Sequence, residues 1–204
     1  MAEYKKSIEN FKAALAGGGV RPSMFQVELR FPNSVVDSTA GVDEQGIFMI
    51  KASQLPASTV GVIDVPFRGR KFKVSGDRTF APWTITVTND TTFNIRKGLE
   101  KWSELIQNHN FVLGANNTDV YQTDAIVRQL DRDGNQLRVY QFNGIWPSSL
   151  SEMGLDMNET DTVQEYTCEF AVQFWSAAGN KAEDADFRSN PVADVTNNKT
   201  RIQS

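Results

Sequence analysis

The residues that most often carry covalent or metal chemistry are scarce in this chain. It holds one cysteine, Cys168, and one histidine, His109, so it lacks both the usual ligand set for zinc and any intrachain disulfide. A cysteine acts as a nucleophile only beside a base, and nothing in the sequence links Cys168 to His109, which lies in the polar stretch 107–110. We therefore expect Cys168 to be a buried structural residue, as free cysteines commonly are.

Two short motifs resemble ligand-binding loops. The run 131–135, Asp-Arg-Asp-Gly-Asn, has the carboxylates of a calcium loop, but its glycine is fourth, whereas an EF-hand has glycine sixth and a helix on each side. The three glycines at 17–19 lack the Gly-Lys-Ser/Thr ending of a phosphate-binding P-loop. We interpret the first motif as a hairpin turn and the second as a hinge, and we expect no metal and no cofactor.

No pattern of serine, aspartate and glutamate forms a nucleophile elbow or a diagnostic acid–base spacing. A cytoplasmic enzyme with a carboxylate-based site stays open as an alternative, without a named residue or substrate. The net charge is −4 and the basic residues are scattered, which disfavours tight nucleic-acid binding. A mildly acidic wall would still allow nucleic acid to move past it.

The length of 204 residues, with 40% hydrophobic and 23% charged residues, is typical of one folded domain. No apolar run approaches the roughly 20 residues that span a bilayer, so we expect no membrane anchor. Charged residues recur through the first 20 positions, where a signal peptide has an unbroken apolar segment. We therefore expect the chain to fold in a cytoplasm.

Hydrophobic spacing predicts two helices. Tyr4, Ile8, Phe11 and Leu15 lie on one side of a short N-terminal helix, which the glycines at 17–19 end. A central helix, whose apolar stripe is expected to lie against a sheet, is predicted from 95 to about 108.

Period-two alternation of apolar residues predicts the strands. They cover 25–31, 47–52, 70–75, 83–88, 125–130, 136–142 and 165–175. We expect 125–142 to form a hairpin that ends at Trp146-Pro147, and the last strand to place Cys168 and Phe174 on one core-facing side. Residues 53–69 contain two prolines and two glycines without steady alternation, so they are predicted to be a long loop and a contact element.

These elements predict a mainly β, β-rich α+β protein: an antiparallel β-sandwich or barrel of two sheets with one flanking α-helix. The expected organisation is an N-terminal helical arm with a glycine hinge (1–20), a β domain (21–175) and a polar, poorly ordered extension (176–204).

Several strings of the sequence resemble one known family. They are RPSMFQVE (21–28), KASQLPA (51–57), SGDRTF (75–80), WTITVTND (83–90), AIVRQ (125–129), GIWP (144–147) and the strand 170–175. In this order they resemble the tail tube proteins of T-even-like contractile phages, over about 21–175. That family is related in fold to the haemolysin-coregulated tube protein of type VI secretion.

The resemblance implies a structural subunit and no enzyme. Such subunits form hexameric rings that stack head to tail into a hollow tube, which houses the tape-measure protein and conducts viral DNA without binding it specifically. The implied partners are other copies of the chain, the tail sheath protein, the tape-measure protein, the baseplate tube initiator and the tail terminator. The implied location is the virion tail, after synthesis in the host cytoplasm.

The resemblance also implies two contact regions. The segment 51–70 is expected to reach the neighbouring ring, through Gln54, Leu55, Pro56, Val60, Val62, Arg68 and Arg70. The N-terminal arm is expected to hold subunits together through Ile8, Phe11 and Leu15. The insert 34–46 and the extension after Trp175 are longer than in the T-even archetype. A single-ring baseplate or tail-terminator relative of the same fold remains the alternative.

Overall fold

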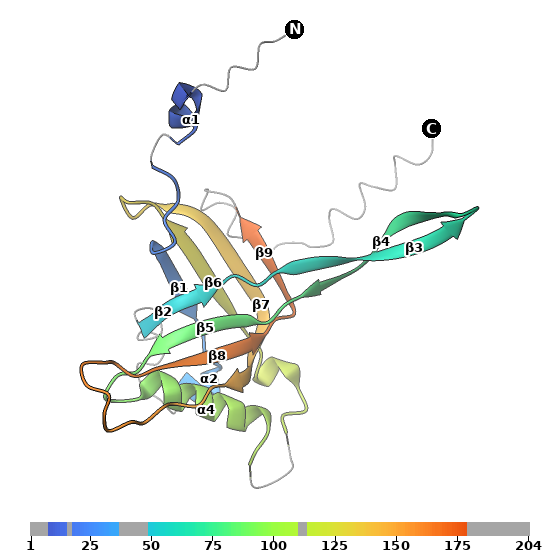
Figure 1. Cartoon of the computed structure of the whole chain (residues 1–204). Helices are drawn as coiled ribbons and strands as arrows, with labels where there is room; N and C mark the ends of the chain where they lie inside the picture. Colours follow the sequence, from blue (N-terminus) through green and yellow to red (C-terminus); the bar gives the residue numbers. More distant parts are fainter. Residues whose placement is uncertain (1–7, 16–17, 37–48, 110–113, 179–204) are drawn as a thin grey trace.

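The computed structural model describes residues 8–15, 18–36, 49–109 and 114–178 (Figure 1). The elements in chain order are α1 (Ile8–Ala14), β1 (Phe25–Leu29), α2 (Asn33–Val36), β2 (Ile50–Gln54), β3 (Ser58–Phe67), β4 (Arg70–Phe80), β5 (Trp83–Thr88), α4 (Asn94–Ile106), the 3-10 turn η1 (Thr118–Val120), β6 (Thr123–Leu130), β7 (Gln136–Leu150), β8 (Glu165–Ala171) and β9 (Phe174–Ala178). Tyr4, most of the insert 34–46 and the extension beyond Ala178 lie outside the described residues. No described helix is long and apolar enough to cross a membrane.

One antiparallel sheet organises the body of the protein. Its strand order is β1-β6-β7-β8-β5-β2, and β9 pairs with β7 beside this path. The remaining strands, β3 and β4, form a separate two-stranded ribbon. The prediction of a mainly β protein with one main helix is therefore confirmed.

The long strand β7 joins the two halves of the sheet. Its first part, Gln136–Ile145, pairs with β6, and from Trp146 onward it pairs with β8. The hairpin of β6 and β7 ends at Trp146-Pro147, as predicted, but the strand itself does not. β7 passes the proline with an irregular register between Pro147 and Ser149 and then continues to Leu150. The two predicted sheets are consequently one bent sheet, and the described strands do not close into a barrel, since β1 and β2 end the order as unpaired edges.

The predicted last strand is two strands in the structure. β8 pairs with β5, whereas β9 pairs with the first part of β7, and the chain breaks between them at Val172 and Gln173. Phe174 is exposed, so its predicted place on the core face is wrong. Apolar alternation continues across the break because both strands carry aromatic residues, which hides the change of partner. The first three residues of the predicted extension, 176–178, belong to β9.

The core lies between the bent sheet and α4. β5 buries Trp83, Ile85 and Val87 completely, in agreement with the alternation of its sequence. Helix α4 buries Leu99 and Trp102 toward the sheet, and the Trp102 indole N–H donates to the Tyr121 carbonyl at 2.7 Å. These residues belong to one hydrophobic cluster that spans both halves of the sheet.

The prediction of a long loop at 53–69 is wrong. Residues 58–67 form β3, which pairs with β4 to make the ribbon. Alternation reveals a strand only when one face is buried, and both faces of this ribbon are largely exposed. The glycines and prolines that indicated a loop fit into this ribbon for two reasons. A bulge lies near Gly61, and no third strand requires the backbone N–H that proline lacks.

Candidate assembly surfaces

The ribbon of β3 and β4 projects far beyond the body of the subunit (Figure 1). Its tip is the two-residue turn Arg68–Gly69, in which both φ angles are positive, at 42° and 80°. This is the backbone requirement of a type I′ turn, whose twist matches that of an antiparallel hairpin. The turn therefore sets the register that pairs Phe67 with Arg70.

The two faces of the ribbon differ in polarity. Cross-strand pairing places Ile63 opposite Val74 and Val65 opposite Phe72, and Phe67 continues the same face. We call these five residues, Ile63, Val65, Phe67, Phe72 and Val74, the ribbon stripe; their exposed fractions run from 40% to 68%. The opposite face pairs Asp64 with Lys73 and Pro66 with Lys71, and the Lys71 ammonium lies 3.3 Å from the Asp64 carboxylate. The ribbon is thus amphipathic, with its apolar face open to solvent.

The two strands of the ribbon approach each other closely near its base. A Cβ on Gly76 would lie 3.2 Å from the carbonyl carbon of Gly61, so the two backbones cross where side chains have little room. The register shifts at the same place, between Val60 and Val62. The Ala81 N–H donates to the Ala57 carbonyl at 3.0 Å and closes the base.

The predicted inter-ring residues lie in several different elements of the structure. Gln54 ends β2, Leu55 is exposed and Pro56 is buried. Val60 and Val62 lie in β3, while Arg68 and Arg70 lie at the tip. The ribbon stripe was missed, although two apolar alternations, 63–67 and 72–74, flank the turn Arg68–Gly69 and together form a hairpin signal.

The predicted N-terminal contacts lie away from the ribbon. Ile8, Phe11 and Leu15 are all exposed on or beside α1, which stands on the chain segment that leads into β1 (Figure 1). Gly18 and Gly19 connect this helix to the body with φ angles of 81° and 73°. The structure therefore offers two separate apolar surfaces in one subunit.

The single cysteine and the single histidine lie in different environments. Cys168 is buried in the core, as predicted, and burial raises the pKa of its thiol to about 12, whereas His109 is exposed. Burial likewise raises the pKa of Tyr166, whose ring lies 5.0 Å from the guanidinium carbon of Arg96. No cluster of three or more His, Cys, Asp or Glu side chains suited to a metal occurs in the described ranges.

The run 131–135 is the predicted hairpin turn. The Asp131 carboxylate accepts the backbone N–H groups of Asp133 and Asn135, each at 2.8 Å, and the Asn135 side-chain amide at 3.1 Å. The hydrogen bonds from Asn135 and the backbone hold the pKa of Asp131 below its usual value. This carboxylate therefore stabilises its own turn.

Comparisons with known proteins identify the family of the chain. Residues 20–178 match the family model described as phage tail tube protein. The chain is 31% identical to tail tube protein gp19 of Enterobacteria phage T4, over 80% of this chain and 95% of that protein. It is also 27% identical to the tail tube protein of Serratia phage KSP90, over 86% of this chain and 98% of that protein.

Two solved structures have the same fold at low identity. The tube-terminating cap of the anti-feeding prophage has a TM-score of 0.59 at 13% identity, over 79% of this chain and 91% of that one. The sheath–tube complex of an extracellular contractile injection system has a TM-score of 0.53 at 13% identity, over 86% of this chain and 99% of that one. On the strength of the family model and the T4 relative, the chain belongs to the phage tail tube protein family and is a structural component of a contractile phage tail.

Proposed function

We propose that this chain forms hexameric rings that stack head to tail into the hollow tube of the tail. The observation that carries the proposal is the ribbon stripe, five large apolar side chains held in solvent on a projecting arm. Burying one such side chain completely contributes about 1.5–3 kcal/mol, so their exposure in a single subunit favours contact with another. The ribbon then reaches into the next ring, and its contacts extend from Val60 to Val74.

Lateral contacts within a ring are proposed for the sheet edges and the N-terminal arm. β1 and β2 each pair on one side only, and open strand edges readily recruit another strand. Pairing such edges between neighbours would complete a barrel-like wall around the tube. Ile8, Phe11 and Leu15 of the arm would cover the adjacent subunit and bury their exposed side chains.

The assembled tube would house the tape-measure protein and later conduct viral DNA. A net charge of −4 per chain suits a conduit that does not hold phosphates. The outer partner in this proposal is the tail sheath protein, and the two ends of the tube meet the baseplate initiator and the tail terminator. A protein of the same fold occurs in a sheath–tube complex, in keeping with the sheath as the outer partner.

A single-ring relative, in the baseplate or at the tube end, is the alternative within the same fold. The likeness to the anti-feeding prophage cap concerns the fold alone, whereas the curated relatives at 27% to 31% identity are tail tube proteins. Polymerisation separates the two functions, because a terminator forms one ring and stops.

Negative-stain electron microscopy of the purified chain, at low and high concentration, tests the proposal alongside the mass from light scattering. We expect hollow tubes or stacked hexameric rings, and isolated rings would favour the alternative. A chain that stays monomeric even when baseplates of its own phage are added would refute both.

A further inference from the structure

The loop between β7 and β8, residues 151–164, carries the two most exposed large apolar side chains of the described ranges. Leu155 is 90% exposed and Met157 is 102% exposed. Val163, near the end of the same loop, is also exposed. Such side chains favour contact with a partner when they gather on one element.

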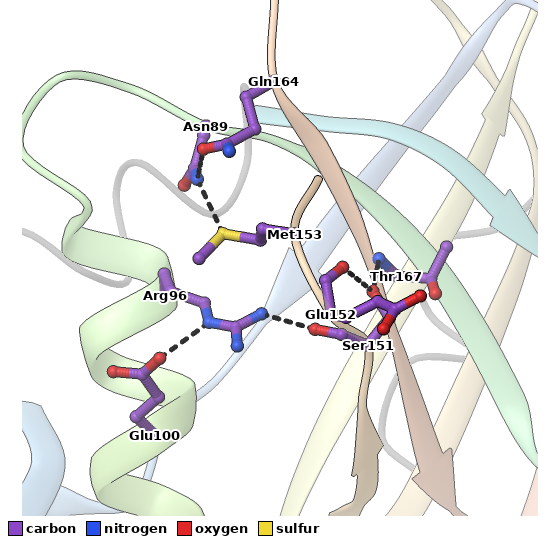
Figure 2. Close-up of polar contacts among 8 residues, drawn as sticks. All are labelled: Asn89, Arg96, Glu100, Ser151, Glu152, Met153, Gln164 and Thr167. Atoms are coloured by element: carbon purple, nitrogen blue, oxygen red, sulfur yellow. Dashed lines mark hydrogen bonds and ion pairs between the residues drawn. The ribbon is translucent and has the colours of Figure 1, made fainter. Parts of the chain in front are cut away.

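The base of this loop is fixed to helix α4 and to β8 (Figure 2). The Arg96 guanidinium donates to the Ser151 carbonyl at 2.9 Å and to the Glu100 carboxylate at 2.7 Å. Asn89 donates to the Gln164 side-chain carbonyl at 2.9 Å, at the other end of the loop. Both ends are therefore held while the tip that carries Leu155 and Met157 extends into solvent, which reduces the entropy lost on docking.

The loop is acidic as well as apolar. Residues 139–180 contain six acidic and no basic residues, and four of the six, Glu152, Asp156, Glu159 and Asp161, lie in the loop. Among the described residues, no ion pair neutralises these four carboxylates. A partner for the loop is accordingly expected to be basic and apolar together.

The ribbon has this composition. Residues 58–80 hold five basic and two acidic residues in a chain whose net charge is −4. Arg68 and Arg70 flank Gly69 at the tip, beside Phe67 of the ribbon stripe. The only described ion pair of this arm joins Lys71 to Asp64, and the Arg68 guanidinium lies 5.5 Å from the centre of the Phe67 ring, so neither tip arginine is paired with a carboxylate.

The loop and the ribbon project from opposite sides of the body (Figure 1). One subunit therefore cannot bring its own ribbon tip onto its own loop. A contact between the ribbon of one copy and the loop of another is heterologous, and it repeats with each added copy.

We propose that the loop 151–164 is the docking surface for the ribbon tip of a second copy of this chain in the adjacent ring. This inference rests on the proposed stacking of rings and identifies the receiving surface. Phe67 of one copy lies against Leu155 and Met157 of the other, and Arg68 and Arg70 face the loop carboxylates. The apolar contact supplies affinity, and the opposite charges set which end of a ring meets which.

Cysteine cross-linking of the full chain tests the contact directly. Phe67→Cys combined with Met157→Cys should give a ladder of disulfide-linked multimers under mild oxidation. Each copy then carries one thiol at the ribbon tip and one in the loop, so the cross-link can continue from copy to copy. The matched control combines Phe67→Cys with Val120→Cys, an exposed position on η1 outside the loop. The control should give no ladder, and the buried Cys168 is common to both variants.

Charge variants separate this inference from the proposed function. A loop variant with Glu152→Lys, Asp156→Asn, Glu159→Lys and Asp161→Asn changes the loop charge from −4 to +2. It should lower the fraction of protein in tubes by at least about 10-fold, because like charges then meet at the interface. Adding Arg68→Glu and Arg70→Glu to the same chain should restore tubes. These positions are exposed, so circular dichroism should show an unchanged fold.

The outcomes differ for the two proposals. Normal tubes from the loop variant, together with no ladder from the Phe67–Met157 pair, would overturn the inference and leave ring stacking intact. Normal tubes that have lost binding to the sheath would overturn it in favour of the sheath as the occupant of the loop. A wild-type chain that forms neither tubes nor rings, even when baseplates of its own phage are added, would refute the proposed function, and the inference with it.

Discussion

The indole of Trp83 stacks on the ring of Phe142, with centroids 4.7 Å apart and an interplanar angle of 11°. Trp83 lies in β5 and Phe142 in β7, and β8 separates these strands in the sheet order. The stack therefore crosses the core between the two halves of the bent sheet. The Trp83 N–H also donates to the Ser53 hydroxyl at 2.9 Å, which ties the end of β2 to the core just before the ribbon begins.

Trp83 is expected to stabilise the fold in two separable ways. Trp83→Ala should lower the free energy of unfolding by about 3–5 kcal/mol, because it removes a fully buried aromatic side chain. Trp83→Phe keeps an aromatic ring but leaves the Ser53 hydroxyl without its donor, and it should cost less, about 1–3 kcal/mol. Urea denaturation followed by circular dichroism measures both, and equal losses would contradict the separation.

Removing the ribbon should abolish stacking without unfolding the body. Residues 58–80 can be replaced by two glycines, because Ala57 and Ala81 already meet through a 3.0 Å hydrogen bond. We expect a folded chain that forms no tubes. The deletion starts after Ala57 because β2 belongs to the main sheet; removing 51–70 would take part of that sheet away.

A point variant of the ribbon stripe tests whether the apolar side chains, and not only the ribbon backbone, are needed for stacking. Phe67→Ser with Phe72→Ser changes two exposed side chains, so the free energy of unfolding should move by less than about 1 kcal/mol. Tube formation, observed by electron microscopy, should still be lost. Long tubes from either variant would show that the ribbon is not the stacking element.

Much of the fold follows from the sequence because most strands bury one face. The alternation at 83–88 matches β5 residue for residue, and the helix predicted from 95 to about 108 matches α4 at Asn94–Ile106. Burial imposes the spacing in both elements. The same physics explains the failure at 53–69, where the ribbon has no buried face.

The pairing partner of each strand is the second feature that the alternation of apolar residues does not predict. β7 passes from β6 to β8 at Trp146, and the chain after β8 returns to the other half of the sheet as β9. These choices depend on where distant strands lie, so one predicted strand became two. The acidic loop 151–164 escaped notice for a related reason, since its two exposed apolar residues become informative only once the ribbon is placed opposite them.

The end of β9 sets how far the C-terminus can be shortened. Truncation after Ala178 should leave stability and tube formation unchanged. Truncation after Trp175 removes residues 176–178, which pair with Val139, Tyr140 and Gln141 of β7, and it should destabilise the chain by about 1–3 kcal/mol through lost strand pairing. Thermal melts of the two truncated chains measure the difference, and equal melting temperatures would contradict it.

The buried thiol of Cys168 should make the fold sensitive to alkali. Burial raises its pKa from an ordinary value of 9.0 to about 12, so the folded thiol stays neutral while the unfolded thiol ionises above about pH 9. The unfolded state then binds fewer protons than the folded state. The thiol's contribution to stability is therefore complete below pH 9 and declines as the pH rises toward 12, by at most about 1.4 kcal/mol per pH unit.

Comparison with Cys168→Ala isolates this effect from other groups that titrate in alkali. Between pH 8 and pH 10.5, wild type should lose about 2 kcal/mol more stability than the variant in urea denaturation. Tyr166 also has a pKa raised first by burial and next by the charge of Cys168, so both chains should carry Tyr166→Phe, which removes its contribution from the difference. Identical pH profiles would mean that the Cys168 thiol ionises as easily in the folded chain as in the unfolded one, and rapid reaction of the native thiol with a disulfide reagent at pH 8 would support that reading.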